Sequence, residues 1–378
     1  MSKFKFRHHF VDLDVPPMLA QTCLADLDGD GQLEYIVGER YGTLYWYKYQ
    51  APDRWTRHVL GHDSPSDVGC IALDVTGDGR LDVIAGGVWY RNTGDYGQPF
   101  ERHVFDAQLE AVHDIAAADI DGDGRPEIIT MSDKNDLRWY KIPAEPTGAW
   151  QHQVIGPAVH AGVAVGDLDG DGDLDIVRTN VWFENVNGDG SKWQVRPIGP
   201  NTYPPADFRP RFAFDGVRAV VCDMNGNGRN DVVFCDAEIP GGAVWWMENL
   251  DGVGHYWERH DICRPTVPRR GALHSLYVGD LDGDGDLDVF SCEMETVRGD
   301  APPRFFIWEN LDGVGGAWQE HVIFDGNLGG HEAVVGDVSG NGWPDIIAKP
   351  WQPHPDNALG GKMFILFLEN LGIHSNSK

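Results

Sequence analysis

Long apolar stretches are missing from this 378-residue chain. No apolar run approaches the roughly 18 residues that a transmembrane helix needs. The first residues, Met-Ser-Lys-Phe-Lys-Phe-Arg-His-His, also lack the apolar segment of a secretion signal. We therefore expect no membrane partner and a cytoplasmic location, or a secreted protein if an export signal has been removed from the N-terminus.

Basic residues and paired cysteines are also scarce. The chain has 30 Lys and Arg against 59 Asp and Glu, and no basic stripe offsets its formal net charge of −29. Such a charge repels phosphate backbones, so we expect no nucleic-acid partner. The six cysteines form no Cys-x-x-Cys pair and most lie in apolar runs, which predicts buried free thiols. No nucleophile elbow, P-loop or dinucleotide fingerprint stands in a suitable context.

One unit is present seven times. It consists of an apolar run that ends in Asp, a Gly-rich acidic loop and a second apolar run, and the first Asp of each loop stands at 26, 74, 119, 167, 223, 280 and 337. A spacing of 45 to 57 residues is typical of a four-stranded propeller blade. We therefore predict an all-β, seven-bladed β-propeller that forms a single domain over residues 1–378.

The two ends of the chain are predicted to share a blade. Six units end in an outer strand of the type Trp55-Thr-Arg-His-Val, whereas the seventh stops after its third strand at residues 364–370. The N-terminal segment Phe6-Arg7-His8-His9-Phe10-Val11 has the missing outer-strand pattern. We therefore predict that a strand at residues 4–11 completes blade seven, which would remove the exposed sheet edges.

The acidic loops have the pattern of calcium sites. Carboxylates at positions 1, 3, 5 and 9 converge on a hard cation, and glycines at positions 4 and 6 allow the tight turn. We predict several structural Ca²⁺ ions at the turns between the first and second strands. The loops at residues 223–231 and 337–345 carry two carboxylates each, so we expect the weakest binding there, with metal-free turns as the alternative. The predicted ligands are Asp26, Asp28, Asp30, Glu34, Asp74, Thr76, Asp78, Asp82, Asp119, Asp121, Asp123, Glu127, Asp167, Asp169, Asp171, Asp175, Asp223, Asn225, Asn227, Asp231, Asp280, Asp282, Asp284, Asp288, Asp337, Ser339, Asn341 and Asp345.

The unit Gly-Asp-Leu-Asp-Gly-Asp-Gly-Asp-Leu-Asp-Ile-Val resembles the FG-GAP/VCBS repeat of integrin-type propellers, and the resemblance covers essentially the whole chain. Among such propellers, the chain resembles the polysaccharide lyases of the rhamnose–glucuronate lyase type and aldos-2-ulose dehydratase. This resemblance implies chemistry on a sugar. A fold does not specify chemistry, however, so the site must be argued from its residues.

Titratable residues recur where the innermost strands begin, on the face opposite the acidic turns. His113, His274 and His331 stand six positions before the first Asp of their loops, His160 stands seven before and Arg218 five before. We predict that these five residues converge on one axial pocket and are catalytic. The residues expected to bind substrate are Gln21, Arg40, Asp114, Lys134, Arg178, Glu332 and Lys349. The histidines that repeat on the outer strands are expected to be structural or solvent-exposed, namely His58, His103, His260 and His321.

These residue types suit β-elimination. An arginine neutralises the carboxylate of a uronate, and a base of near-neutral pKa removes the neighbouring proton. We therefore predict a carbon–oxygen lyase that acts on a uronate-containing or oxidised sugar. We expect the protein to be a monomer. Two alternatives stay open: a keto-sugar dehydratase whose histidines hold a further divalent metal such as Zn²⁺, and a non-catalytic propeller that binds a glycan or a protein. The sequence does not assign the roles among the four histidines.

Overall fold

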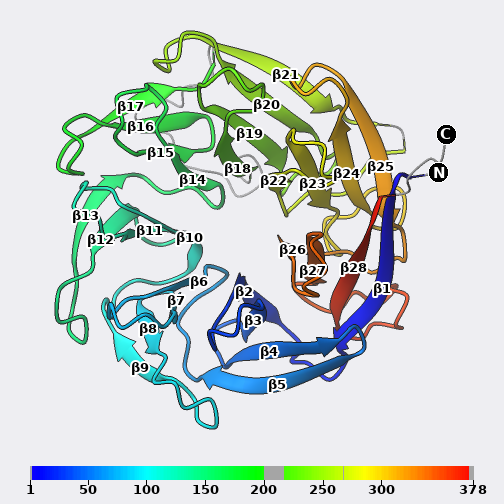
Figure 1. Ribbon diagram of the computed structural model, residues 1–378, viewed down its shortest axis with the longest axis horizontal. Coiled ribbons are helices and arrows are strands. Elements are labelled where there is room, and N and C mark those ends of the chain that lie inside the picture. The colour runs from blue at the N-terminus through cyan, green and yellow to red at the C-terminus, as the bar shows by residue number, and fades with distance from the viewer. Residues whose placement is uncertain (1, 200–216, 267, 374–378) are drawn as a thin grey trace.

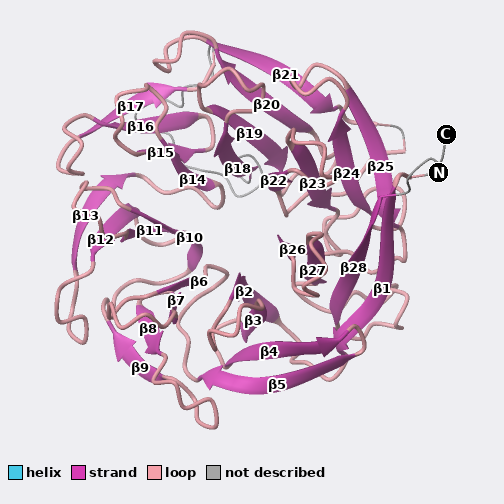
Figure 2. Cartoon of the chain, in the orientation of Figure 1, coloured by secondary structure: helices cyan, strands magenta, loops and turns pink. Residues whose placement is uncertain are grey.

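The computed structural model describes residues 2–199, 217–266 and 268–373, and in these ranges the chain forms strands and loops without a helix (Figure 2). The 28 strands in these ranges form seven antiparallel four-stranded sheets around a central axis, which confirms the predicted seven-bladed propeller (Figure 1). None of these ranges contains a helix of the length and apolarity needed to cross a membrane.

In each blade the four strands follow one another from the axis outward. Blade one contains β2 (Leu19–Ala25), β3 (Glu34–Glu39), β4 (Leu44–Ala51) and β5 (Arg54–Gly61). Blade two contains β6 (Ile71–Leu73), β7 (Asp82–Ala85), β8 (Val88–Arg91) and β9 (Glu101–Val104). Blade three contains β10 (Val112–Ala118), β11 (Glu127–Ser132), β12 (Leu137–Lys141) and β13 (Gln151–Gly156). Blade four contains β14 (Val163–Gly166), β15 (Asp175–Arg178), β16 (Val181–Asn185) and β17 (Trp193–Pro197).

The remaining three blades follow the same order. Blade five contains β18 (Val217–Cys222), β19 (Asp231–Asp236), β20 (Val244–Asn249) and β21 (Trp257–Cys263). Blade six contains β22 (Tyr277–Gly279), β23 (Asp288–Cys292), β24 (Phe305–Asn310) and β25 (Trp318–Phe324). Blade seven contains β26 (Glu332–Gly336), β27 (Asp345–Lys349), β28 (Ile365–Ile373) and the N-terminal strand β1 (Phe4–Asp12).

Strand β1 closes the ring as the sequence predicted. It pairs antiparallel with β28, from Phe4 opposite Ile373 to Asp12 opposite Ile365 (Figure 1). Phe4 is buried, and Phe6 and Phe10 pack against the same core cluster between blades six and seven. The closing strand is therefore held by backbone pairing on one side and by aromatic burial on the other.

The hydrophobic core lies between neighbouring blades. Each of seven clusters joins two consecutive blades, and one of them closes the ring by joining Tyr35 of blade one to Phe367 of blade seven. Three outer-strand histidines are structural, as expected: His58, His103 and His260 stack on buried tryptophans of the third strands. All six cysteines lie in the described part and are free thiols, and three of them are fully buried.

The acidic loops form the turns between the first and second strands of all seven blades. In blade four, the Gly172 N–H donates to Asp167 at 3.0 Å, and the Leu168 N–H donates to the buried Asp175 at 2.9 Å. The corresponding two bonds recur in the other six loops. Gly170 and Gly172 adopt φ of 76° and 95°, a region that favours glycine, so the loop backbone depends on these residues.

Candidate functional site

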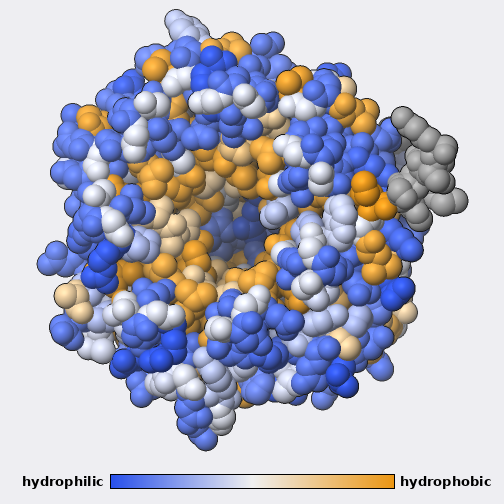
Figure 3. Space-filling view, viewed as in Figure 1, coloured by the Kyte–Doolittle hydropathy of each residue, from blue (hydrophilic) through white to orange (hydrophobic). Residues whose placement is uncertain are grey.

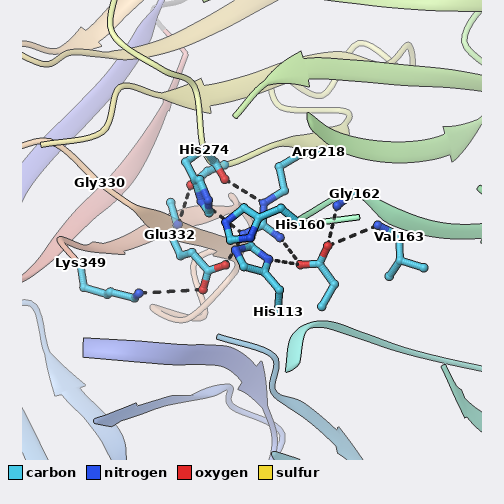
Figure 4. Close-up of polar contacts among 12 residues, drawn as sticks. His113, His160, Gly162, Val163, Arg218, His274, Gly330, Glu332 and Lys349 are labelled. Atoms are coloured by element: carbon cyan, nitrogen blue, oxygen red, sulfur yellow. Dashed lines mark hydrogen bonds and ion pairs between the residues drawn. The ribbon is translucent and has the colours of Figure 1, made fainter. Parts of the chain in front are cut away.

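Four histidines meet at the axis, where the innermost strands begin, and three of them, His113, His160 and His274, are labelled in Figure 4. His113 lies on β10, whereas His160, His274 and His331 precede β14, β22 and β26. The ring centroids of His113 and His160 are 4.1 Å apart, those of His113 and His274 are 5.6 Å apart, and those of His274 and His331 are 3.9 Å apart. The structure therefore brings all four predicted histidines into one group.

Arg218 lies beside this group and is already engaged. Its guanidinium forms ion pairs with Asp114 of blade three and Glu332 of blade seven, and its Nε donates to the His274 carbonyl at 3.0 Å (Figure 4). Burial would raise the pKa of Asp114, but the charge of Arg218 and the contact with His113 hold it well below its usual range. The three charged residues therefore form a buried ionic layer across the axis, with only 17% of the Arg218 side chain exposed.

A second set of carboxylates surrounds His160 and His274. His160 Nδ1 lies 2.8 Å from Asp133 Oδ1, and His274 Nε2 lies 3.0 Å from Glu238 Oε1. Burial opposes a charge on His160, but Asp133 and Glu238 raise its pKa to about 9. Burial and the nearby Arg218 charge lower the pKa of His274 to about 4. At neutral pH, His160 is therefore a cation and His274 is neutral.

The buried layer separates two cavities. The turn-side cavity, of about 240 Å³, is lined by Asp114, Arg218, His274 and Glu332, together with apolar residues of the inner strands such as Leu276. Figure 3 shows this pattern on the face toward the viewer, where hydrophobic residues surround a central hollow with a hydrophilic floor. Of the five predicted catalytic residues, Arg218 and His274 line this turn-side cavity.

The far-side cavity, of about 320 Å³, lies on the opposite side of the ionic layer. It is lined by His113, His160 and His331 among the predicted catalytic residues, and by Arg40 among the predicted substrate-binding residues. Arg40 is paired with Asp67 at 2.8 Å and lies over the ring of Trp351. This cavity therefore contains most of the predicted histidines but not Arg218.

The other predicted substrate-binding residues are dispersed. Gln21 is buried and donates to the Ser66 carbonyl, and Arg178 is buried and donates to the Pro157 carbonyl. Lys134 is exposed and pairs with Glu110. Lys349 is fully buried, donates to the Leu19 carbonyl at 3.1 Å and lies 3.9 Å from Glu332. None of these four residues lines either of the two axial cavities.

Some lining residues were absent from the predicted site. Asp133, Glu238 and Trp351 follow the second strands of blades three, five and seven, and all three line the far-side cavity. Their signal is their place after a second strand, which ends on the same face as the start of a first strand. They stand 14, 15 and 14 residues after the first Asp of their acidic turns, so this nearly constant offset could have identified them.

The acidic turns fit a hard cation. Ligand atoms of Asp26, Asp28 and Glu34, and of the equivalent residues in blades three and four, lie within 4.8 Å of one another. Several oxygens in the loops are buried without a hydrogen-bond partner, among them Asp28 Oδ1, Thr76 Oγ1 and Ser339 Oγ. In blade four, burial and the neighbouring carboxylates raise the pKa of Asp175 to about 7. Carboxylate and hydroxyl oxygens that lack a hydrogen-bond partner are the kind of ligand that Ca²⁺ prefers.

The turns are not equivalent, because the third strand brings a lysine to some of them and a glutamate to others. In blades one and three, Lys48 and Lys141 reach into the loop, where their Nζ atoms lie 2.7 Å from Asp30 and 2.8 Å from Asp123. A glutamate stands at the same place in blades four to seven, namely Glu184, Glu248, Glu309 and Glu369. The ammonium groups of blades one and three therefore offset part of the negative charge of their own loops.

Comparisons with known proteins agree with this architecture. Residues 26–85, 74–130, 125–177 and 223–291, which together exceed half of the chain, match the family described as FG-GAP-like repeat. No curated protein matches the chain. Two crystal structures of BBS1N in complex with ARL6DN, one soaked with lead and the other with mercury, are similar to it, each with a TM-score of 0.55 and 11% identity over 99% of both chains. At this identity the similarity supports the fold alone.

Proposed function

The chain belongs to the FG-GAP-like repeat family, and from this premise we propose that it is a binding propeller whose far-side cavity holds a short, neutral carbohydrate segment. The observation that carries the proposal is the lining of this cavity. An aromatic ring, Trp351, stands there with three carboxylates, those of Asp67, Asp133 and Glu238. A concave site with an aromatic side chain and a few fixed polar groups suits a polyhydroxylated ligand of this size.

The charges of the cavity favour a neutral sugar over an acidic one. Arg40 is paired with Asp67, and His160 is paired with Asp133, so each cation that lines the cavity already has a carboxylate partner. A uronate would have to displace one of these partners. Carboxylate oxygens, by contrast, accept hydrogen bonds from sugar hydroxyls, and such charge-assisted bonds are strong.

The positions and low exposure of the residues predicted to catalyse uronate elimination favour a binding role over catalysis. Arg218 is held by two carboxylates and lines the turn-side cavity, not the far-side one. His113 and His331 are 2% and 5% exposed, so little of either ring is open to a substrate.

One observation favours a lyase or dehydratase as the second candidate. His160 carries a proton at neutral pH, and His331, which is neutral because burial and the neighbouring His274 lower its pKa, lines the same cavity. In an elimination, the base removes a proton from carbon, the carbon–oxygen bond breaks, and the acid protonates the leaving oxygen. His331 as base and His160 as acid would supply these two roles.

We also propose that the acidic turns hold structural Ca²⁺. The partnerless buried oxygens and the clustered carboxylates of these loops support this role. The metal would fix each turn and offset part of the net charge of −29. The turns lie at the ends of the inner strands remote from the far-side cavity, so this calcium would stabilise the ring and take no part in ligand binding.

The test is a binding screen against neutral and acidic oligosaccharides, followed by analysis of each bound sugar. We expect the wild type to bind a neutral oligosaccharide and to leave it chemically unchanged. Trp351→Ala should weaken binding by more than about tenfold, as the loss of a central aromatic contact does. Tyr256→Ala, which removes a ring that is 67% exposed elsewhere on the surface, is the matched control and should bind normally.

Two results would contradict the binding role. Equal affinity of the wild type and Trp351→Ala would show that the cavity does not hold the ligand. Conversion of the sugar to an unsaturated product, abolished in His160→Gln, would establish the lyase or dehydratase in its place.

A further inference from the structure

Three metal-ligating side chains from consecutive blades meet between the two cavities. Glu238 follows β19 in blade five, His274 precedes β22 in blade six, and His331 precedes β26 in blade seven. One ligand atom from each of the three lies within 4.8 Å of the other two. This group is built of nitrogen and oxygen donors, unlike the oxygen-only acidic turns at the other end of the inner strands.

The three side chains are buried, and their donor atoms are poorly satisfied. His274 is fully buried, His331 is 5% exposed, and the Glu238 side chain is 7% exposed. The Nδ1 atom of His331 has no hydrogen-bond partner, and His274 Nε2 has only the contact with Glu238 at 3.0 Å. A buried polar atom that is left unpaired destabilises the folded state, so a partner at this place would stabilise the site.

We propose that Glu238, His274 and His331 bind one transition-metal ion, and that Zn²⁺ is the ion they suit best. Two imidazoles and one carboxylate are a donor set of zinc sites that keep a fourth position open. Glu238 and His331 line the far-side cavity, so the open position faces that cavity. A water molecule or a ligand hydroxyl completes the coordination there.

The surroundings supply an outer shell for this ion. His160 Nε2 lies 3.7 Å from Glu238 Oε1, and Asp133 holds the opposite nitrogen of the same ring. An imidazole fixed by a carboxylate in this way orients the groups next to a metal. Asp114 and Glu332 lie behind His274 and offset the charge of Arg218, so the bound ion does not meet an unpaired cation.

Coordination also requires one local change. Binding through His274 Nε2 leaves the ring proton on Nδ1, which lies 3.3 Å from Arg218 Nη2. Two donors do not share that contact, so these atoms must separate as the metal binds. Arg218 Nη2 keeps its ion pair with Glu332, which leaves the guanidinium satisfied.

Metal binding at this place can be tested without a sugar. The full chain is treated with chelator and dialysed against excess Ca²⁺, which fills the acidic turns, and is then titrated with Co²⁺. We expect visible d–d absorption that saturates at one Co²⁺ per chain and disappears when Zn²⁺ is added, since Zn²⁺ binds the same nitrogen and oxygen donors.

Two conservative variants locate the site. Glu238→Gln and His331→Gln should each weaken Co²⁺ binding by more than about tenfold, because changes around a metal commonly cost that much affinity. His58→Gln, which alters a histidine stacked on Trp46 in an outer strand, is the control and should titrate like the wild type. Circular dichroism confirms that each variant is folded.

Two outcomes would overturn the proposal. One is a folded wild-type chain without a saturable Co²⁺ band in excess Ca²⁺. The other is a band that both Glu238→Gln and His331→Gln retain at unchanged affinity. Because the wild-type titration is decisive by itself, a variant that fails to fold does not leave the proposal untested.

Discussion

Replacing Arg218 by methionine should destabilise the propeller rather than disable a substrate-binding group. The guanidinium forms ion pairs with Asp114 and Glu332, which come from two other blades, and 17% of its side chain is exposed. Methionine has a similar length but no charge. The substitution therefore leaves two carboxylates in the interior without a cation.

The size of the effect follows from this arrangement. Removing one partner of a buried ion pair typically costs about 3–5 kcal/mol, because the remaining charge stays buried and uncompensated. With a urea dependence of about 3 kcal/mol per molar, the midpoint of unfolding should fall by about 1–2 M. Adding Glu332→Gln to Arg218→Met should restore part of the lost stability, because it removes one of the two buried carboxylates that have no cation.

The assay is urea unfolding followed by tryptophan fluorescence, with Lys134→Met as the matched control. Lys134 also pairs with a carboxylate, Glu110, but the two side chains are 62% and 61% exposed, so its loss should leave the urea midpoint nearly unchanged. If Arg218→Met and Lys134→Met unfold at the same urea concentration, the reasoning is refuted. The folded fraction of Arg218→Met should bind the ligand of the far-side cavity normally, because Arg218 does not line it.

Further predictions concern the closing strand, the acidic turns and pH. Deleting residues 2–12 should lower the free energy of unfolding by at least about 3 kcal/mol, since Phe4 and two further phenylalanines lose their packing; an unchanged urea midpoint would contradict this. EDTA should lower the melting temperature. Lys141→Glu, which gives blade three the charge pattern of blades four to seven, should tighten Ca²⁺ binding in a calorimetric titration, whereas Lys134→Glu should leave it unchanged. The difference in melting temperature between the wild type and His160→Gln should be largest near pH 6 and should vanish above about pH 9. The reason is that folding raises the pKa of His160 from 6.5 to about 9, so its charge stabilises the fold fully below pH 6.5 and this contribution is lost as the ring deprotonates. A difference that stays constant with pH would refute this assignment.

Much of the fold could be predicted because its signals are local. Each blade repeats its own apolar alternation and its own turn glycines, so a spacing of 45 to 57 residues is visible without any long-range contact. The closing strand was predictable for the same reason. Phe4, Phe6 and Phe10 alternate with polar residues, and this pattern matches the six other outer strands.

The candidate site was predictable only as a set of residues. The offsets from the acidic turns placed His113, His274 and His331 in one layer, and the structure brings their rings together. Arg218 stands one residue closer to its turn, as do Asp114 and Glu332. These three form a separate layer, in which ion pairs across the axis divide the predicted pocket in two.

The sequence by itself determined the number of blades, the closing strand and the positions of the acidic turns, because local sequence patterns encode each of these features. Only the tertiary structure decided which charges meet at the axis. Arg218 reaches Asp114 over a separation of 104 residues and Glu332 over 114, and Glu238 and Trp351 reach the same cavity from blades five and seven. Such contacts depend on the closure of the whole ring, which no local pattern encodes.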